Sequence, residues 1–256
     1  MSSLKIIQIT DLHLSANKST LIHNINTYES AQRIISVIKD DHNDLNALVL
    51  TGDLVMDESH EGYEHLNNLL KPIDCPIFLI PGNHDSVSEI QWLSQKPNLY
   101  NDNFKVYNHW ILFMFNSKKE GALEGIFHEQ EIFNFEQLLN IYPEKNFLIF
   151  VHHPMSSIKS DWMDGMMIEN PEKVKKLIID NPNVKAISSG HVHQEFTDSL
   201  GDTKIFTTPS TCYQFKPHAK KFALDHTKSS GYRVFELEDS GLLKSEVCRS
   251  NQKDKA

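Results

Sequence analysis

The sequence predicts an α/β fold in a single domain over residues 1–250. Apolar, strand-like runs alternate with helical stripes through about residue 190, and a strand-rich segment follows them. Such alternation is typical of βαβ units built around a central sheet. A chain of 256 residues can bury a sizeable core without disulfides or structural metals. The Lys- and Asp-rich end, residues 251–256, is expected to form a frayed tail.

The predicted strands are short apolar runs bounded by turn residues, and the predicted helices have apolar residues every three or four positions. The strands span Leu4–Thr10, Ala47–Leu50, Ile77–Ile80, Trp110–Phe115, Phe147–Val151, Val184–Ser188, Thr203–Thr207, Tyr232–Glu238 and Leu243–Arg249, the last two joined by a turn at Ser240-Gly241. The helices span Thr27–Asp40, Gly62–Leu70, Gln130–Ile141 and Pro171–Ile179, with Pro171 at the first helical position.

Composition excludes several classes of protein. The chain has 25 Lys and Arg against 34 Asp and Glu, a net charge of −9, so we expect no nucleic-acid partner bound through a basic face. No apolar run approaches the length of about 18 residues that a membrane helix needs, and the first residues do not form a signal peptide. Three widely spaced cysteines without a CxxC motif favour reduced thiols. We therefore expect a cytoplasmic protein with no membrane partner.

Five polar clusters each follow a predicted strand. They are Asp11-Leu12-His13, Gly52-Asp53, Gly82-Asn83-His84-Asp85, His152-His153-Pro154 and Gly190-His191-Val192-His193, and they include several of the 14 histidines. Sites in open α/β sheets form beyond the carboxyl ends of the strands. The clusters are therefore expected to converge on one crevice, although they are far apart in sequence.

The residue types in these clusters indicate a metal site. They offer Asp, His, Asp, Asn, His, His and His, and no cysteine, which suits Mn²⁺, Fe or Zn²⁺. Seven ligands are too many for one tetrahedral ion and suit two ions that share a carboxylate. In extended backbone, His191 and His193 would point to one side. Glycines beside the ligands allow close backbone approach. Each cluster alone could be an ordinary turn, so the prediction depends on all five together.

Taken in this order, the five clusters resemble the signature of the calcineurin-like metallophosphoesterase superfamily. Other segments resemble the bacterial class III 3′,5′-cyclic-nucleotide phosphodiesterases, so that the resemblance covers nearly the whole chain. These segments are Ile9–His13, Gly52–Leu54, Trp162–Asp164, Pro209–Pro217, Gly231–Arg233 and Glu246–Arg249.

The resemblance implies a four-layer α/β-β/α sandwich with two divalent metal ions at the sheet edge, Fe or Mn in preference to Zn. The first ion would be bound by Asp11, His13 and His193, and the second by Asn83, His152 and His191, with Asp53 as the bridge. His84 would be the catalytic residue that contacts the phosphate. The substrate-binding residues would be His13, Asp53, Asn83, His84 and His193. His153, the second of its pair, would either support the ligands from behind or be structural.

The predicted function is hydrolysis of 3′,5′-cyclic AMP to 5′-AMP by in-line attack of a metal-bridging hydroxide. His84 would donate a proton to the leaving oxygen or stabilise charge on the phosphoryl group. Asp85 is expected to cap the following helix. Tyr213, Phe215 and Trp162 are candidates to contact the base, although packing is the more common role for such residues.

Several alternatives stay open. The chain could be a metallophosphodiesterase of other specificity, acting on glycerophosphodiesters or 2′,3′-cyclic nucleotides. A nuclease would need a basic track with stacking aromatic residues, and the sequence near the motifs has no cluster of Lys and Arg. A non-catalytic scaffold would be expected to lack some of the ligands, and all seven are present. The protein could be a monomer or a homodimer.

Overall fold

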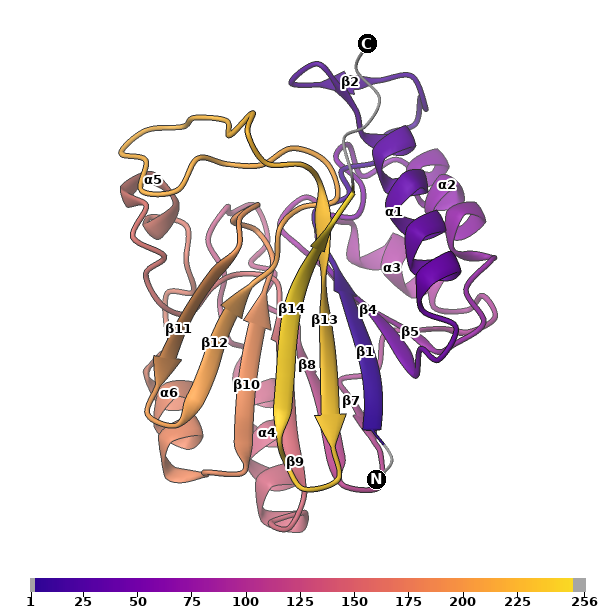
Figure 1. The fold of residues 1–256 in the computed structure, drawn as a ribbon. Coiled ribbons are helices and arrows are strands. Elements are labelled where there is room, and N and C mark those ends of the chain that lie inside the picture. The colour runs from indigo at the N-terminus through magenta and orange to yellow at the C-terminus, as the bar shows by residue number, and fades with distance from the viewer. Residues whose placement is uncertain (1–2, 251–256) are drawn as a thin grey trace.

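The computed structural model describes residues 3–250 and contains two six-stranded sheets that pack face to face, with helices on their outer faces (Figure 1). The first sheet has the order β14 (Leu243–Arg249), β13 (Gly231–Glu238), β1 (Ser3–Ile9), β4 (Ala47–Thr51), β5 (Ile77–Ile80) and β6 (Leu99–Tyr100). The second has the order β11 (Phe196–Leu200), β12 (Thr203–Thr207), β10 (Val184–Ser189), β9 (Asn146–Val151), β8 (Trp110–Phe115) and β7 (Phe104–Val106). The tail predicted at 251–256 lies outside the described residues.

Six helices and a short hairpin complete the described part of the chain. The helices are α1 (Thr27–Asp41), α2 (His60–Leu70), α3 (Val87–Leu93), α4 (Glu129–Ile141), α5 (Asp161–Asp164) and α6 (Glu172–Asp180). The hairpin pairs β2 (Leu21–Ile22) with β3 (Ile25–Asn26). Between residues 3 and 250, no helix is both long enough and apolar enough to span a membrane.

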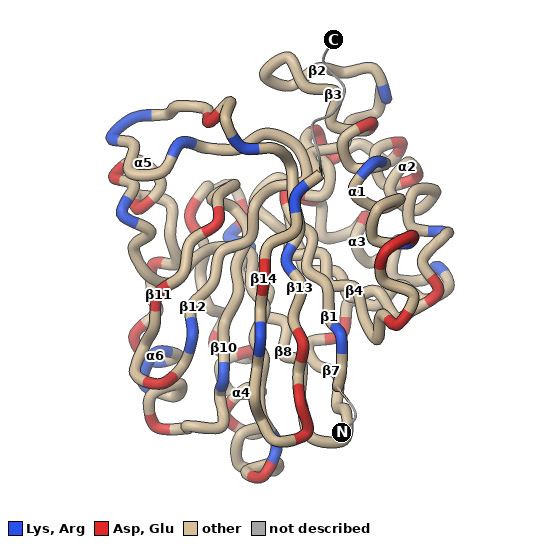
Figure 2. Tube along the Cα trace, in the orientation of Figure 1, with Lys and Arg blue, Asp and Glu red and all other residues tan. Residues whose placement is uncertain are grey.

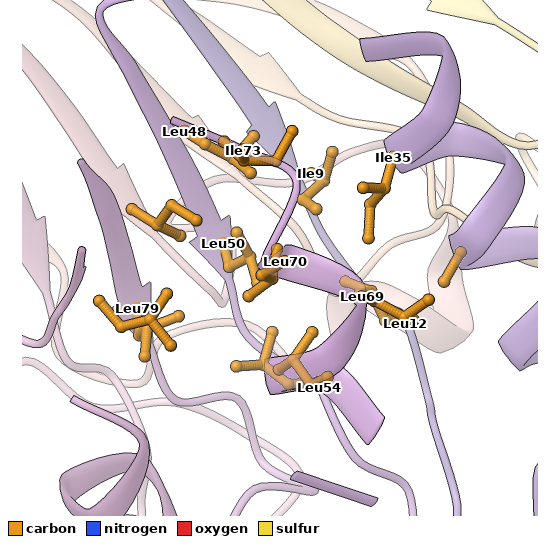
Figure 3. Packing of buried hydrophobic residues seen from close by; sticks show 14 of the residues in the cluster. Ile9, Leu12, Ile35, Leu48, Leu50, Leu54, Leu69, Leu70, Ile73 and Leu79 are labelled. Carbon is orange, nitrogen blue, oxygen red and sulfur yellow. The ribbon is translucent and has the colours of Figure 1, made fainter. Parts of the chain in front are cut away.

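Three apolar clusters separate the four layers, which confirms the predicted sandwich. One cluster packs α1, α2 and α3 on the first sheet, and its close packing of Ile and Leu side chains is visible in Figure 3. A second packs α4 and α6 on the other sheet, and a third fills the space between the sheets. Alternate residues of the central strands face different clusters: in β4, Leu48 and Leu50 face the helices, whereas Val49 faces the other sheet. Burial on both faces explains why these strands are continuous apolar runs.

The long elements match the sequence prediction closely, and the short ones do not. Strands β5, β8, β12 and β14 have the predicted bounds, and most other predicted elements differ by one or two residues at an end. The prediction omitted β2, β3, β6, β7, β11, α3 and α5, which have two to seven residues each. Pro171 is the N-cap of α6 and not its first residue. The alternation of strands and helices alone indicated one central sheet, whereas the structure has two.

A buried polar network joins the two sheets in their common core. The side chain of Gln8 on β1 accepts hydrogen bonds from Ser188 Oγ on β10 and from Thr208 Oγ1 at 2.7 Å, and it donates to Thr51 Oγ1 at 2.8 Å. All four side chains are fully buried. A buried network in which every member is paired specifies a single arrangement of its strands. The network therefore fixes how the strand ends of one sheet meet those of the other.

A partly buried carboxyl group on α4, that of Glu131, lies at the end of β8. The backbone N–H of Asn116 donates to Glu131 Oε2 at 2.8 Å, and Asn103 Nδ2 donates to Oε1 at 2.9 Å. Burial raises the pKa of Glu131 to about 7, although both hydrogen bonds lower it. A carboxyl whose pKa is raised by folding stabilises the protein fully below its unfolded pKa and loses that contribution as the pH rises through its folded pKa.

We therefore predict that the stability difference between wild type and Glu131→Gln changes with pH. Between pH 5 and pH 8, wild type should lose about 1–3 kcal/mol relative to the variant, because only wild type must ionise a buried carboxyl. Urea denaturation at several pH values measures this difference. Glu129→Gln, an exposed change on the same helix, should show no such trend. A constant difference for Glu131→Gln would contradict the prediction.

Candidate metal centre

The five predicted clusters follow β1, β4, β5, β9 and β10, and they meet at one edge of the two sheets. The loops after β1 and β4 are hydrogen-bonded together, since the N–H of Asp11 donates to the carbonyl of Gly52 and the N–H of His13 to that of Asp53, both at 2.9 Å. Across the sheets, His13 Nε2 lies 3.1 Å from His193 Nε2. The sequence rule that placed these clusters together is thus confirmed in the described residues.

One group of ligand atoms comes from Asp11, His13 and His193. Each offers a ligand atom within 4.8 Å of the others, and all three side chains are buried. Asp11 Oδ1 lies 3.3 Å from His193 Nε2. The carboxylate of Asp11 also accepts the backbone N–H of His191 and the hydroxyl of Thr10. These hydrogen bonds hold the carboxylate in place without a cationic side chain.

A second group surrounds His152. Its Nε2 lies 3.4 Å from Asp53 Oδ1 and 3.2 Å from Asn83 Oδ1. The ring of His191 lies 5.1 Å from that of His152, centre to centre. The other oxygen of Asp53, Oδ2, lies 3.8 Å from His13 Nε2. Asp53 therefore lies between the two groups, with one carboxylate oxygen directed to each.

The imidazoles of the site are oriented by backbone carbonyls. His152 Nδ1 donates to the carbonyl of Thr51 at 2.7 Å, and His193 Nδ1 donates to that of Tyr213 at 2.9 Å. A hydrogen bond from one ring nitrogen fixes the tautomer and directs the lone pair of the other toward the metal. In both rings that other nitrogen is Nε2, which faces the carboxylates.

Burial and charge set the protonation states of the group. Burial lowers the pKa of His13 and of His191 to about 3, so both rings are neutral near pH 7 and each keeps a lone pair. Burial alone would raise the pKa of Asp53, but the imidazole of His152 holds it well below its usual range. Burial alone would lower the pKa of His152, but the carboxylate of Asp53 raises it to about 9, so this ring holds a proton that a bound cation would replace. Within each group, carboxylate and imidazole atoms that lie within 4.8 Å of one another form a donor set that fits divalent cations.

Five of the seven predicted ligands have left-handed backbone conformations. Their φ angles are positive: Asp11 53°, His13 49°, Asp53 52°, His191 66° and His193 44°. Such conformations cost about 1–3 kcal/mol each and are concentrated at functional sites. The expectation that His191 and His193 point to one side of an extended segment is wrong, because they lie in a turn after β10. His193 joins the group of His13, and His191 joins that of His152.

His84 and Asn83 are the least buried residues of the site, so the open side of the centre lies there. The backbone N–H of His84 donates to Asp53 Oδ1 at 3.0 Å, and its ring packs edge-on against His13 at 5.4 Å. Asp85 does not cap α3, since Ser86 does. The carboxylate of Asp85 instead accepts the N–H groups of Leu54, Val55 and Gly82 and the hydroxyl of Tyr63. Asp85 thus joins the loops that carry Asp53 and His84.

The sequence prediction did not include two residues that lie at the site, Ser117 and Lys118. They follow β8, so the rule used for the other five strands would have found them. Ser117 Oγ lies 2.8 Å from Nδ1 of His153. The buried ammonium of Lys118 donates to the carbonyl of Asn83 at 3.1 Å. The loop after β8 therefore supports both the His-His pair and the loop of Asn83.

His153 lies closer to the centre than a purely structural residue would need to. Its ring packs 4.7 Å from those of His152 and His191, and it shares a group of ligand atoms with them. Among the described residues, its buried Nε2 has no hydrogen-bond partner. His152 is nevertheless the member of the pair that contacts Asp53 and Asn83.

Comparison with known families identifies the fold and the motif order. The family described as calcineurin-like phosphoesterase matches residues 4–195, which include all seven predicted ligands. The chain belongs to this family. The four-layer fold implied by the resemblance is correct.

Curated relatives cover nearly the whole chain. A protein of Haemophilus influenzae named 3′,5′-cyclic adenosine monophosphate phosphodiesterase CpdA is 33% identical over 97% of this chain and 91% of its own length. The protein of the same name from Escherichia coli K12 is 32% identical over 96% of this chain and 90% of its own. A protein of Nostoc named 3′,5′-cyclic-nucleotide phosphodiesterase is 29% identical over 96% of the chain.

Solved structures share the fold at low sequence identity. A dimetal phosphatase from Danio rerio has a TM-score of 0.65 at 14% identity and covers 91% of this chain and 95% of its own. GAP50, described as the anchor in the inner membrane complex of Plasmodium, has a TM-score of 0.70 at 13% identity, with 99% and 87% covered. Proteins with different described roles share this fold, so function must be argued from the site.

Two glycines allow the loops of the site to pack closely against each other. A Cβ on Gly190 would overlap Thr10 Oγ1, and a Cβ on Gly82 would overlap Oδ1 and the backbone nitrogen of Asp53. The atoms that a Cβ on Gly82 would overlap belong to Asp53, which lies between the two ligand groups. Asp53 would therefore have to move to make room for the new Cβ. The close approach expected from the glycines in the motifs is thus present.

We predict that Gly82→Ala lowers the metal content of the purified protein, as Asp53→Ala should. Gly165→Ala is the matched control, because this residue has an ordinary φ of −73° and the nearest atom to a new Cβ is 3.6 Å away. Elemental analysis after dialysis against Mn²⁺ gives the number of ions per chain. Retention of the wild-type number in Gly82→Ala and Asp53→Ala would show that Asp53 does not hold a metal.

Proposed function

We propose that this chain hydrolyses 3′,5′-cyclic AMP to 5′-AMP at a dinuclear metal centre. The names of the curated relatives support the substrate. The position of Asp53 is the structural observation that carries the proposal, because its two oxygens lie 3.8 Å from His13 Nε2 and 3.4 Å from His152 Nε2. A carboxylate between two groups of ligand atoms could bind a divalent ion through each of its oxygens.

The proposed assignment of ligands follows the two groups. Asp11, His13 and His193 would hold one ion, Asn83, His152 and His191 the other, and Asp53 both. Oxygen and imidazole donors suit Fe or Mn, with Zn also possible. When bound, divalent ions would supply Lewis acidity toward the phosphodiester and lower the pKa of a water molecule.

His84 would act on the leaving group. Its backbone N–H is fixed on Asp53, and its half-buried ring lies at the open side of the centre against His13. A proton held on this imidazole can pass to the 3′-oxygen as the phosphorus–oxygen bond breaks, or remain and stabilise the phosphoryl charge. Asn83, His13 and His193 would line the floor beneath the phosphate.

Local charge favours an anionic substrate despite the net charge of −9. Lys118 is buried beside Asn83. Exposed lysines also lie on the loop between β12 and β13, at Lys216, Lys220 and Lys221, and blue segments mark this loop in Figure 2. These basic residues were not predicted from the sequence. They would raise the local concentration of a nucleotide monoanion.

We further propose that the protein acts in the cytoplasm as a single-domain monomer or homodimer. The three cysteines, Cys75, Cys212 and Cys248, are free thiols, which suits a reducing compartment.

A substrate panel tests the proposed reaction. Mn²⁺-loaded protein should hydrolyse 3′,5′-cyclic AMP with a higher kcat/KM than a 2′,3′-cyclic nucleotide, bis(p-nitrophenyl) phosphate or a glycerophosphodiester, because the relatives named for cyclic AMP match the whole chain. Preference for a glycerophosphodiester or a 2′,3′-cyclic nucleotide would assign a different substrate to the same centre. Absence of turnover on every diester, with metals bound, would indicate a scaffold.

We also predict that His84→Ala retains its metal ions but loses about 10²–10⁴-fold in kcat, the usual contribution of a general acid. Steady-state kinetics and elemental analysis on the same preparation separate the two effects. His109→Ala, an exposed histidine immediately before β8, should match wild type in both. Unchanged turnover in His84→Ala would remove the proposed role of this residue.

A further inference from the structure

A closed set of ring contacts connects two predicted metal ligands with the surface. Tyr213 stacks on His13 at 5.5 Å and packs 4.7 Å from His193, while Phe215 stacks on His193 at 4.3 Å. Outward from these rings, His23 contacts Tyr213 at 4.8 Å and Phe222 contacts Phe215 at 5.6 Å. His23 and Phe222 touch each other at 5.3 Å and close the set.

The inner and outer rings have different exposure. Tyr213 and Phe215 are buried behind the metal ligands and belong to a small apolar cluster, so they are packing residues and not surfaces for a ligand. Phe222 is 51% exposed, and His23 is also exposed. Trp162 is partly buried and supports the set from behind, 4.9 Å from Phe215 and 5.5 Å from Phe222. Tyr213, Phe215 and Trp162, the candidates chosen from the sequence to contact the base, therefore lie beneath Phe222 and His23, the rings that a ligand can reach.

Local structure holds both exposed rings in place. His23 and Asn24 are the central residues of the β2–β3 hairpin, and their positive φ angles of 51° and 65° are typical of a type I′ turn. Phe222 lies on a loop whose base is a short antiparallel ladder: Lys216 N–H donates to Ala223 carbonyl, and Phe215 pairs with Leu224. Both rings are thus preorganised, which lowers the entropy cost of binding.

The distances fit a nucleotide anchored at the centre. Only one buried ring separates Phe222 from His193, and one separates His23 from His13. Along the first path the ring centres are 5.6 Å and 4.3 Å apart, and along the second they are 4.8 Å and 5.5 Å apart, so each exposed ring lies two ring contacts from a predicted ligand. The exposed Lys220 and Lys221 directly precede Phe222, so the same loop offers positive charge and an aromatic face. The metal centre and the lysines therefore suit the phosphate, and the nearby aromatic rings suit the base.

We propose that Phe222 and His23 form the subsite that stacks the base of the cyclic nucleotide. This inference rests on the proposed function, because it assigns the base of a substrate whose phosphate lies at the metal centre. Aromatic stacking depends on the π-face that every base has and reads no pattern of donors and acceptors. The subsite therefore favours nucleotides over base-free phosphates and discriminates little between adenine and guanine.

The test compares two ligands that differ only in the base, 5′-AMP and ribose 5-phosphate. Their dissociation constants are measured by calorimetry on the Mn²⁺-loaded protein. Wild type should bind AMP about five-fold to 150-fold more tightly than ribose 5-phosphate, the range expected for one stacked base. Phe222→Ala and His23→Ala should reduce this ratio, and Phe222→Tyr should retain it because the ring remains.

Kinetics and a matched control complete the test. In Phe222→Ala the loss should fall on KM for cyclic AMP and not on kcat, because stacking binds substrate and transition state alike. Phe133→Ala removes a ring that is 52% exposed on α4 and should change neither the binding ratio nor KM.

The possible failures are distinguishable. If wild type hydrolyses cyclic AMP but binds AMP and ribose 5-phosphate equally, or if Phe222→Ala keeps the wild-type ratio, the subsite is overturned and the proposed function stands. If wild type hydrolyses no cyclic nucleotide, the proposed function fails, whatever the binding ratio. An equal loss in Phe133→Ala would also overturn the subsite, because the effect would then not be local.

Discussion

Two buried carboxylates, Asp11 and Asp53, impose the main physical constraint on this structure. Both lie among imidazoles, and in the described residues neither contacts a Lys or Arg side chain. A buried charge costs several kcal/mol unless it is paired and hydrogen-bonded. Backbone N–H groups of His191 and His84 meet part of this requirement. Divalent cations would meet the rest, so the fold and the metals are expected to stabilise each other.

The polar network beneath the site explains how two separate sheets can supply one centre. Gln8 lies three residues before Asp11, Thr51 two before Asp53 and Ser188 three before His191, so the network joins the strands just before the predicted ligands. A slip of one residue in any of these strands would leave buried hydroxyl and amide groups unpaired and would reverse the faces of the strand. Hydrogen bonding inside the core therefore sets the distance between ligands that lie outside it.

The sequence predicted those parts of the site that follow from strand periodicity and from the carboxyl-end rule. Continuous apolar runs located β1, β4, β5, β9 and β10, and the residues after them are the ones that converge. The prediction failed where tertiary contacts override local pattern. Asp85 has the spacing of a helix cap, yet its buried carboxylate accepts backbone donors from another loop. The turn that holds His191 and His193 is left-handed at both residues, and alternation could not reveal it.

The base subsite illustrates a further limit of sequence reasoning. The predicted metal ligands follow strands, whose ends are fixed by the sheets. His23 and Phe222 instead come from a two-residue turn and an irregular loop, and they lie 199 positions apart in the chain. No periodicity relates such segments, and an exposed Phe in a polar loop is unremarkable on its own. The contacts of His23 with Tyr213 and of Phe222 with Phe215 connect these two exposed rings to the centre. Loops can change without disturbing strand ends, so this fold can keep its metal chemistry while the surface that selects the base varies.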